Sequence, residues 1–426
     1  MSPSPSGRLT NWAGNITFAA SALHVPATVD ALQHLVASRH RIRALGTGHC
    51  FNRIADTRGE LVSLADLELP IEIDGDTRTA VVPAGKRYAE VAATLDGLGW
   101  ALHNLGSLPH ISVAGACATG THGSGDRNRN LSSAVEAVEF IRADGEVVRL
   151  SRVANPDRFG GAVLSLGALG VLTRLTLSIE PSFDVRQDVY LDLPVDVAAE
   201  HASEIFGAGY SVSMFTDWRQ PDLINAIWLK RRVDHDSGPA EGDWFGAPLA
   251  DRPQHPIPGL DAAAATTQLG QVGRWHERLP HFRADFTPSY GEELQSEYFL
   301  PRASATDAIQ ALRAIAARFV GPLAVCEIRT IAADDLWLSP CHGRDTVALH
   351  FTWVRDLDAV LAALASIEAA IAPFDARPHW GKVFRVPPAK FEEIYPQLPA
   401  FRALAAEYDP NRKFGNSFLD TYVHRC

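Results

Sequence analysis

The stretch "SVAGACATGTHGSG" at residues 112–125 decides the fold of this chain. It ends a longer segment, residues 97–125, that contains no Asp, Glu, Lys or Arg. Side chains this small let the backbone approach a bound molecule closely, and backbone N–H groups and the hydroxyls of Ser112, Thr119 and Thr121 can then donate hydrogen bonds. The segment therefore predicts a cradle along a long ligand. A tightly packed Gly/Ala turn in the core is the alternative.

Two glycines precede a histidine in "ALGTGHCFN" at residues 44–52. A dinucleotide fingerprint G-x-G-x-x-G needs a third glycine for close packing of a helix on a strand, and Phe51 occupies that place. The stretch does not predict a Rossmann fold, but Gly46 and Gly48 permit a tight turn whose N–H groups face a phosphate. A hydrolase elbow G-x-S-x-G is also excluded, because each candidate serine lacks a flanking glycine: Ser107, Ser124 and Ser165.

Composition bounds the class of protein. The 426 residues are 46% hydrophobic and 21% charged, which is typical of a globular protein with two large domains or three small ones. The net charge of -11 disfavours nucleic acid as a partner, because such a surface repels phosphates. The one compact basic run, "LKRR" at residues 229–232, is therefore interpreted as a solvated strand end rather than an anion site.

Cysteine usage and the N-terminal residues bear on the compartment. Five cysteines without a C-x-x-C pair predict a reducing environment and argue against a zinc ribbon. The first residues lack the basic and apolar regions of a signal peptide, and no apolar run approaches about 18 residues. We therefore expect a cytoplasmic protein without a membrane span. Loose ligand candidates, such as His110 with His122 or residues 341–345, do not predict a metal site.

The order of the elements predicts two parts. Up to Pro181 the chain has short strands and helices, among them a helix at 29–40 and a hairpin in "IEIDGDTRTAVVPAG" at 71–85. Beyond it, longer alternating strands appear together with two Ala-rich helices at 304–318 and 357–371. These shifts predict a first domain, a second domain and a segment that returns to the first, at residues 1–182, 183–375 and 376–426.

Strand periodicity sorts the polar residues of the second part. In "TVALHFTWV" at 346–354, the large apolar side chains share one face, and His350 and Thr352 lie on the other. In "CEIRT", Glu327 and Arg329 share one face, where they either converge on a ligand hydroxyl or form a solvated ion pair. Lys382 in "HWGKVF" lies between aromatic residues, where desolvation lowers the pKa of an amine and favours a role in proton transfer.

The combination resembles the flavoproteins related to vanillyl-alcohol oxidase and para-cresol methylhydroxylase, and within that family it is similar to the bacterial alditol (xylitol) oxidases. The similarity runs from "TNWAGNITF" near the N-terminus to "DPNRKFGNSFLD" near the C-terminus. The most specific pieces are "GTGHCFNRIAD", "NLGSLPHISVAGACATGTHGSG", "LGALGVLT", "WHERLPHFRADFTPS", "LQSEYF", "CEIRT", "HFTWV" and "RPHWGKVF".

The resemblance implies an α+β fold: a two-part FAD-binding domain of the PCMH type and a substrate (cap) domain with a large antiparallel sheet flanked by helices. It also implies FAD as cofactor, joined covalently to His49. The positions that match the family's cofactor contacts are Gly46, Thr47, Gly48, His49, Cys50, Ser107, Ser112, Gly115, Thr119, Gly120, Thr121, His122, Val171 and His350.

The reaction implied by the resemblance is oxidation of the terminal (C1) hydroxyl of linear polyols such as xylitol and sorbitol. Hydride passes from C1 to flavin N5, and O2 is reduced to H2O2. An aldonolactone oxidase or dehydrogenase of the same fold is the alternative. We expect a polyol and O2 as partners, and a monomer or small oligomer. The positions that match substrate contacts are Ser107, Gln295, Glu327, Arg329, Thr352 and Lys382, of which Lys382, Arg329 and Glu327 are the catalytic candidates.

Two positions depart from the family pattern. Cys50 stands where serine is common, which alters a local hydrogen bond. Gly106 replaces the alanine expected before Ser107, which leaves more room for oxygen beside a flavin.

Overall fold

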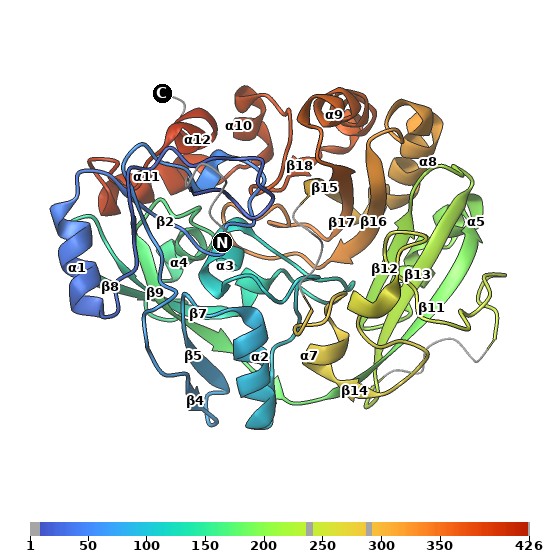
Figure 1. Cartoon of the computed structure of the whole chain (residues 1–426), viewed down its shortest axis with the longest axis horizontal. Helices are drawn as coiled ribbons and strands as arrows, with labels where there is room; N and C mark the ends of the chain where they lie inside the picture. The colour runs from blue at the N-terminus through green and yellow to red at the C-terminus, as the bar shows by residue number, and fades with distance from the viewer. Residues whose placement is uncertain (1–8, 236–241, 287–291, 425–426) are drawn as a thin grey trace.

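Two short-stranded sheets build the N-terminal part of the computed structural model, which describes residues 9–235, 242–286 and 292–424 (Figure 1). One sheet has the strand order β1-β3-β2 and is parallel, and the other has the order β4-β5-β9-β7-β8 and is antiparallel. The strands are β1 (Leu23–His24), β2 (Ile42–Ala44), β3 (Glu60–Val62), β4 (Glu72–Asp74), β5 (Thr79–Pro83), β7 (Val135–Ile141), β8 (Val147–Ser151) and β9 (Val171–Ser178).

Helices cover these sheets. They are α1 (Val29–Ser38), α2 (Tyr88–Gly97), α3 (Val113–Thr119) and α4 (Pro156–Val163). The side chain of Thr28 caps α1 by accepting from the backbone N–H of Ala31, so the predicted helix begins at its N-cap. The predicted hairpin at 71–85 is confirmed as β4 and β5. A pair of two-residue strands, β6 (Trp100–Ala101) and β10 (Glu180–Pro181), leads out of this part.

A large antiparallel sheet follows, with the order β14-β11-β13-β12-β16-β17-β15-β18 in the described residues. Its strands are β11 (Asp184–Pro194), β12 (Ser211–Thr216), β13 (Leu223–Arg232), β14 (Gly273–Arg274), β15 (Glu293–Pro301), β16 (Leu323–Ile331), β17 (Thr346–Val354) and β18 (Arg377–Pro378). The accompanying helices are α5 (Val195–Glu200), α6 (Ala202–Gly207), α7 (Trp275–Arg278), α8 (Ala305–Ile315) and α9 (Leu357–Ile371). The α+β fold class is therefore confirmed.

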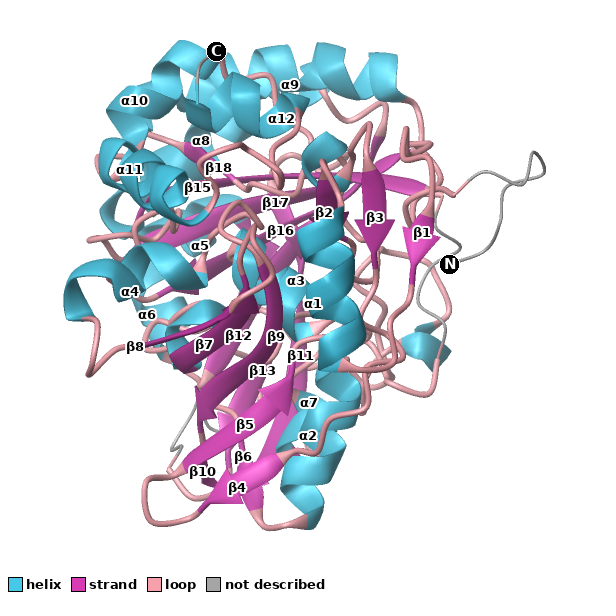
Figure 2. Ribbon diagram, turned by 90° about the vertical axis from the view of Figure 1, so that its left-hand side faces the viewer, coloured by secondary structure: helices cyan, strands magenta, loops and turns pink. Residues whose placement is uncertain are grey.

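The two faces of the large sheet differ in chemistry. On β17, Val347, Leu349, Phe351 and Trp353 belong to one apolar cluster with buried residues of α5, α8 and α9, as the alternation predicts. The opposite face turns toward the N-terminal part, and α3 lies between the two (Figures 1 and 2). That inner face carries the polar residues from which the site is built.

The C-terminal helices are α10 (Phe391–Ile394), α11 (Leu398–Tyr408) and α12 (Ser417–Leu419), of which α11 contacts α4 and packs Tyr408 edge-on against Phe140 of β7. Their buried side chains belong to the same apolar cluster as those of α2, α4, β7 and β9. The turn before them, residues 379–383, is bound to the edge of β15, because the N–H of His379 donates to the Glu297 carbonyl (3.0 Å) and that of Val383 to the Gln295 carbonyl (2.8 Å).

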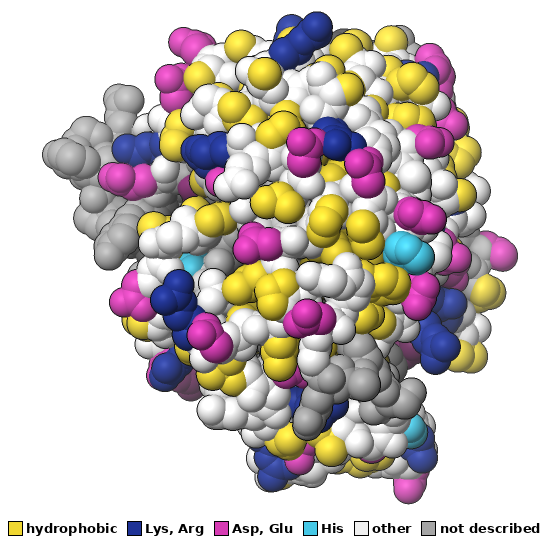
Figure 3. Space-filling view, turned by 90° about the vertical axis from the view of Figure 1, so that its right-hand side faces the viewer, with side chains coloured by type: hydrophobic (Ala, Val, Ile, Leu, Met, Phe, Trp, Pro, Cys, Tyr) yellow, Lys and Arg dark blue, Asp and Glu magenta, His cyan; other side chains and the backbone are white. Residues whose placement is uncertain are grey.

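One described helical stretch, Leu357–Phe374, is long and apolar enough by length and composition to cross a membrane. In the fold, its α9 portion packs on the large sheet through a row of buried residues that includes Val360, Leu364 and Ile367. A core helix passes the same test. Figure 3 shows acidic, basic and apolar side chains mixed over the face beside β11 and α5, without a continuous basic patch on that face.

The interpretation of "LKRR" as a solvated strand end is wrong. Lys230 and Arg231 of β13 are 1% and 4% exposed. Arg231 forms a buried ion pair with Asp188 of β11. Lys230 points toward the inner face and binds backbone carbonyls. A compact run of charges is usually solvated, but here the fold surrounds Lys230 and Arg231 with acceptors.

Candidate active site

The centre of the inner face is a row of three titratable residues on adjacent strands. Glu297 of β15 lies opposite His350 of β17, which lies opposite Glu327 of β16. Because alternate residues of a strand share a face, Gln295, Thr352 and Arg329 lie on the same side as this row. The fold therefore concentrates charged and hydroxyl groups on one buried surface.

Glu297 is the hub of this surface. Its Oε1 accepts from His122 Nε2 at 3.1 Å and from an Arg329 guanidinium nitrogen at 3.2 Å, and its Oε2 accepts from Lys382 Nζ at 2.7 Å. Burial alone would raise the pKa of the Glu297 carboxyl, but Lys382, His122 and Arg329 outweigh burial and hold that pKa well below its usual value. Glu297 is therefore a buried carboxylate that holds three donors in place.

Lys382 reaches the row from the turn at 379–383. Its Nζ lies 2.7 Å from Glu297 Oε2 and 2.6 Å from His350 Nδ1. Burial lowers the pKa of Lys382, and Glu297 opposes this shift. Burial and the neighbouring Lys382 lower the pKa of His350 to about 4, so its ring is neutral near pH 7. Its Nε2 faces Thr352 Oγ1 at 3.2 Å.

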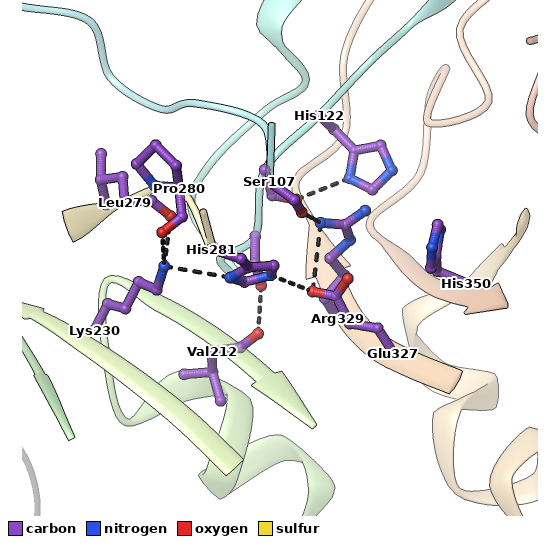
Figure 4. A network of polar contacts seen from close by, with 12 residues as sticks. Ser107, His122, Val212, Lys230, Leu279, Pro280, His281, Glu327, Arg329 and His350 are labelled. Atoms are coloured by element: carbon purple, nitrogen blue, oxygen red, sulfur yellow. Dashed lines mark hydrogen bonds and ion pairs between the residues drawn. The ribbon is translucent and has the colours of Figure 1, made fainter. Parts of the chain in front are cut away.

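Arg329 connects the row to the N-terminal part (Figure 4). One guanidinium nitrogen donates to Ser107 Oγ at 3.0 Å and lies 3.4 Å from Glu327 Oε1. The same Glu327 oxygen accepts from His281 Nε2 at 2.8 Å. Burial would raise the pKa of Glu327, but Arg329 and His281 hold it far below its usual value. Arg329 keeps its charge, because Glu327 and Glu297 overcome its desolvation and raise its pKa.

A second group of predicted residues lies in the turn after β2. Thr47 Oγ1 lies 2.9 Å from His49 Nδ1 and accepts from the Ser112 backbone N–H at 3.3 Å. The His49 ring stacks on Trp12 with 5.0 Å between the ring centroids. Burial, followed by His110 and Arg87, lowers the pKa of His49 to about 4, so this imidazole is neutral near pH 7.

Ser112 lies where two glycines, Gly46 and Gly115, leave room for its side chain. Its hydroxyl is buried and has no hydrogen-bond partner among the described residues. A Cβ added to Gly46 would collide with that hydroxyl, and one added to Gly115 would lie 2.8 Å from it. A buried hydroxyl without a partner is costly, so a bound group that accepts from it stabilises this arrangement.

Two family models match different parts of the chain. A family model described as "FAD binding domain" matches residues 20–151, and one described as "D-arabinono-1,4-lactone oxidase" matches residues 289–422. An alditol oxidase from Streptomyces sp. is 51% identical over 97% of this chain and 98% of its own length.

The chain belongs to the alditol oxidase family.

Two more distant matches are a relative in sequence and a solved structure. An L-gulono-1,4-lactone dehydrogenase from Mycobacterium tuberculosis is 28% identical over 96% of this chain and 97% of its own length. The crystal structure of a cholesterol oxidase from B. sterolicum superposes with a TM-score of 0.76 at 16% identity, covering 98% of this chain and 96% of that one. The last likeness shows the fold alone. The expected flavoprotein family and FAD-dependent oxidoreductase class are confirmed.

FAD is the cofactor of this alditol oxidase family member, and the residues present fit it. The absence of side chains at Gly46 and Gly115 leaves room for the Ser112 hydroxyl, which has no partner among the described residues and can donate to a bound polar group. The residues that would hold FAD are those of the turn at 46–50 and of the stretch at 112–122. Among residues 9–235, 242–286 and 292–424, no group of three or more His, Cys, Asp or Glu side chains is arranged to hold a metal ion.

Some predicted cofactor residues, and the predicted substrate contact Gln295, have local roles. The Thr119 hydroxyl donates to the Gly115 carbonyl, and Gly120 ends α3 in the left-handed region (φ 76°). Val171 begins β9 and pairs with Ile141. Gln295 lies on the inner face, and its amide donates to Glu293. These contacts lie outside the ring around Glu297, which consists of His122, Arg329, Lys382 and His350.

Cys50 contributes to a junction between two turns. Its thiol is free and lies 3.0 Å from where a Cβ on Gly381 would be. The Phe51 N–H donates to the Gly381 carbonyl (2.7 Å), and the Asn52 amide donates to the carbonyls of Trp380 (2.7 Å) and Lys382 (2.8 Å). The turn that bears His49 is thus bound directly to the turn that bears Lys382. A methyl at Gly106, the other departure, would lie 3.4 Å from Thr121 Cγ2.

Sequence reasoning missed Glu297, His281, Lys230 and Asn52. The sequence could have indicated Glu297, because it lies two residues after the predicted site residue Gln295 and so shares its strand face. No sequence pattern indicated Lys230 or His281, because their hydrogen-bond partners come from distant parts of the chain.

Proposed function

We propose that this protein oxidises the terminal hydroxyl of linear polyols to the aldose. The observation that carries this proposal is the inner face itself, which presents carboxylate, guanidinium, amide and hydroxyl groups side by side in a buried setting. A polyol offers a row of hydroxyls, each of which both donates and accepts hydrogen bonds. The 51% identity with a protein named alditol oxidase supports the same substrate class.

Positioning is the first task of these side chains. Ser107, Glu327 and Arg329 form one connected group, and Gln295 and Thr352 lie across from each other on β15 and β17. Together they would hold consecutive hydroxyls of an extended chain. Hydride transfer depends on a narrow range of donor orientation, so fixing the carbon chain supplies much of the rate.

Lys382 is the base in this proposal. A neutral amine has two N–H groups, and Lys382 has two acceptors, Glu297 Oε2 and His350 Nδ1. The lone pair is then free to take the proton of the substrate hydroxyl. Arg329 cannot serve as base, because a guanidinium stays protonated in proteins. Its charge instead stabilises the developing alkoxide.

Bound FAD supplies the hydride acceptor for this reaction. We propose that His49 is its covalent attachment point, which the neutral state of the ring and its fixed place between Thr47 and Trp12 support. Acid-precipitated protein tests this point. Yellow colour should stay with the pellet of the wild type and move to the supernatant for His49→Ala. Colour in the wild-type supernatant contradicts the attachment.

We also propose O2 as the acceptor of electrons, with H2O2 as product, and a cytoplasmic monomer or small oligomer. The four described cysteines are free, which supports a reducing compartment. A peroxide assay under air tests the formation of H2O2, and a sedimentation measurement tests the oligomeric state.

An aldonolactone substrate is the second candidate. The lactone oxidase family model matches residues 289–422, which include the inner-face residues of β15, β16 and β17. Anaerobic titration of the holoenzyme with xylitol, sorbitol, glycerol and L-gulono-1,4-lactone separates the two. We expect xylitol and sorbitol to bleach the flavin at the lowest concentrations. Bleaching by the lactone alone contradicts polyol oxidation, and bleaching by none of them contradicts both.

A further inference from the structure

Lys230 is a buried lysine that the proposed reaction does not use. Its Nζ lies 2.6 Å from the Leu279 carbonyl, 2.8 Å from the Pro280 carbonyl and 3.4 Å from His281 Nδ1. Burial lowers the pKa of Lys230 well below its usual value, and Glu327 opposes this shift. Two carbonyl oxygens and a ring nitrogen surround Nζ (Figure 4), and only the ammonium form, with three N–H groups, can donate to all of them. Lys230 therefore fixes both the backbone of residues 279–281 and the histidine ring.

The state of His281 follows from these contacts. Its Nδ1 accepts from Lys230, so the ring proton lies on Nε2 and is donated to Glu327 Oε1. Phe215 and Trp228 pack edge-on against the ring, with centroid separations of 5.4 and 5.2 Å. Burial lowers the pKa of His281 to about 4, so it donates as a neutral ring. Orientation and tautomer are both set by the surroundings.

The backbone of the same segment holds Ser107. The N–H groups of His281 and Phe282 both donate to the Ser107 carbonyl at 3.2 Å. On the other side, Thr266 Oγ1 donates to the Pro280 carbonyl at 2.8 Å. Residues 279–282 thus join Ser107 of the N-terminal part to the large sheet. Lys230 of β13 fixes this junction by binding the carbonyls of Leu279 and Pro280.

We propose that Lys230 and His281 are positioning residues that direct Glu327 to recognise one substrate hydroxyl. This inference rests on the proposed polyol oxidation. His281 and Arg329 both occupy Oε1 of Glu327, and no hydrogen bond from the described residues reaches Oε2. Oε2 of Glu327 is thereby left to accept a hydrogen bond from a substrate hydroxyl. Beside it, the Ser107 hydroxyl accepts a hydrogen bond from Arg329, and the Ser107 backbone is held by residues 281 and 282.

The charged groups around the network keep Glu327 ionised. Arg329 and Lys230 face His281, together with Glu327 itself. His350 faces Glu327 from β17, and Arg278 faces Lys230 from α7. Loss of the His281 N–H donor removes one of the two close contacts that hold the Glu327 carboxyl in its ionised form, and the pKa of Glu327 then rises.

Two variants of similar polarity separate positioning from general damage. His281→Gln places its amide near the position of Nε2 and retains a donor to Glu327. His281→Asn places its amide near the position of Nδ1, where it keeps the contact with Lys230 but does not reach Glu327. The substrates are xylitol and pentitols that lack one secondary hydroxyl, and the measurements are flavin content, KM and kcat from pH 5 to 9.

We expect His281→Asn to raise KM for xylitol about tenfold or more, because a hydrogen bond to a charged group is lost. Its preference for xylitol over the deoxy analogue that lacks the recognised hydroxyl should fall by a similar factor. His281→Gln should stay within about threefold of the wild type in KM and in this preference.

The inference is overturned if His281→Asn and His281→Gln have the same KM and the same preference for xylitol. It is also overturned if His281→Asn keeps the wild-type preference for xylitol over the deoxy analogues. Lys230→Gln keeps His281 but removes the charge beneath it, and it should shift the same ratio in the same direction. An unchanged ratio in Lys230→Gln counts against the inference even where the histidine variants do not fold. Wild-type protein that fails to oxidise xylitol contradicts the proposed function instead, which keeps the two failures distinct.

Discussion

Glu297 sets the charge state of Lys382, because its carboxylate is the nearest anion to that amine. We expect Glu297→Gln to lower the pKa of Lys382 further, since burial then acts without its counter-ion. The rate of anaerobic flavin reduction rises with pH as Lys382 loses its proton, so this rise should move to lower pH in the variant. Stopped-flow reduction from pH 5 to 10 measures the shift.

Glu368→Gln is the matched control for Glu297→Gln. Glu368 accepts from Tyr298, the residue after Glu297, on the opposite face of β15. The control should leave the pH dependence in place. A variant at Glu297 whose profile overlays that of the wild type would show that Lys382 is not the titrating group.

Lys382 itself gives a second prediction at this scale. Lys382→Met should retain bound FAD and reduce it at saturating xylitol more slowly by a factor on the order of 10^3, because general base catalysis contributes about 10^2 to 10^4. Lys390→Met, a change at an exposed lysine paired with Glu393, should reduce flavin normally. Near-normal reduction in Lys382→Met contradicts the role of base.

At the scale of elements, the junction between the turns at 46–52 and 379–383 couples the two halves of the site. Asn52→Asp keeps a side-chain oxygen that accepts from the Ile54 N–H and caps the short helix Arg53–Ala55, but it removes both donors to the second turn. We expect kcat to fall about tenfold and stability to fall by about 1–2 kcal/mol, since two buried carbonyls lose their donors. Turnover with xylitol and thermal unfolding measure these effects.

Asn52→Ala separates the two roles of that side chain. It loses the cap, worth about 1 kcal/mol, as well as the donors, but it does not place a carboxylate oxygen against the two carbonyls. Its kcat should fall as in Asn52→Asp, because both variants release Lys382. Wild-type turnover in either variant argues against coupling through this junction.

Local periodicity predicted the elements well, because it depends on neighbours within one strand or helix. The faces of 346–354, the hairpin at 71–85 and the helix at 357–371 follow from spacing alone. The ring around Glu297 does not follow, since its members lie on three strands and two loops that meet in space through strand order. The burial of Lys230 was missed for the same reason: its acceptors are about 50 residues further along the chain.

At the scale of the molecule, polar contacts join the N-terminal part to the large sheet. Asn130, which follows the glycine-rich stretch, donates to Asp334 beyond the end of β16 at 2.8 Å, and Arg302 pairs with Asp126 at 3.0 Å. The Ser124 hydroxyl donates to the Val212 carbonyl of β12. The stretch that decides the fold thus leads directly into the contacts that hold the two parts together.

Asp334 makes this junction sensitive to pH. Burial raises its pKa from 3.8 to about 6, although Ser339 and the Leu336 N–H oppose the shift. Between these two values the folded state binds more protons than the unfolded chain. The contribution of Asp334 to stability is therefore complete below pH 3.8 and is lost as the pH rises through about 6, by up to about 3 kcal/mol.

The asparagine side chain in Asp334→Asn does not titrate, so the variant does not lose this contribution to stability as the pH rises. We expect the melting temperature of the variant, relative to the wild type, to increase steadily from pH 4.5 to 7.5. The comparison is made as a difference at each pH, because carboxylates with lowered pKa values, such as Glu297, change the stability of both proteins alike. A constant difference for Asp334→Asn would mean that its carboxyl is already ionised at pH 4.5 and that the junction does not respond to pH.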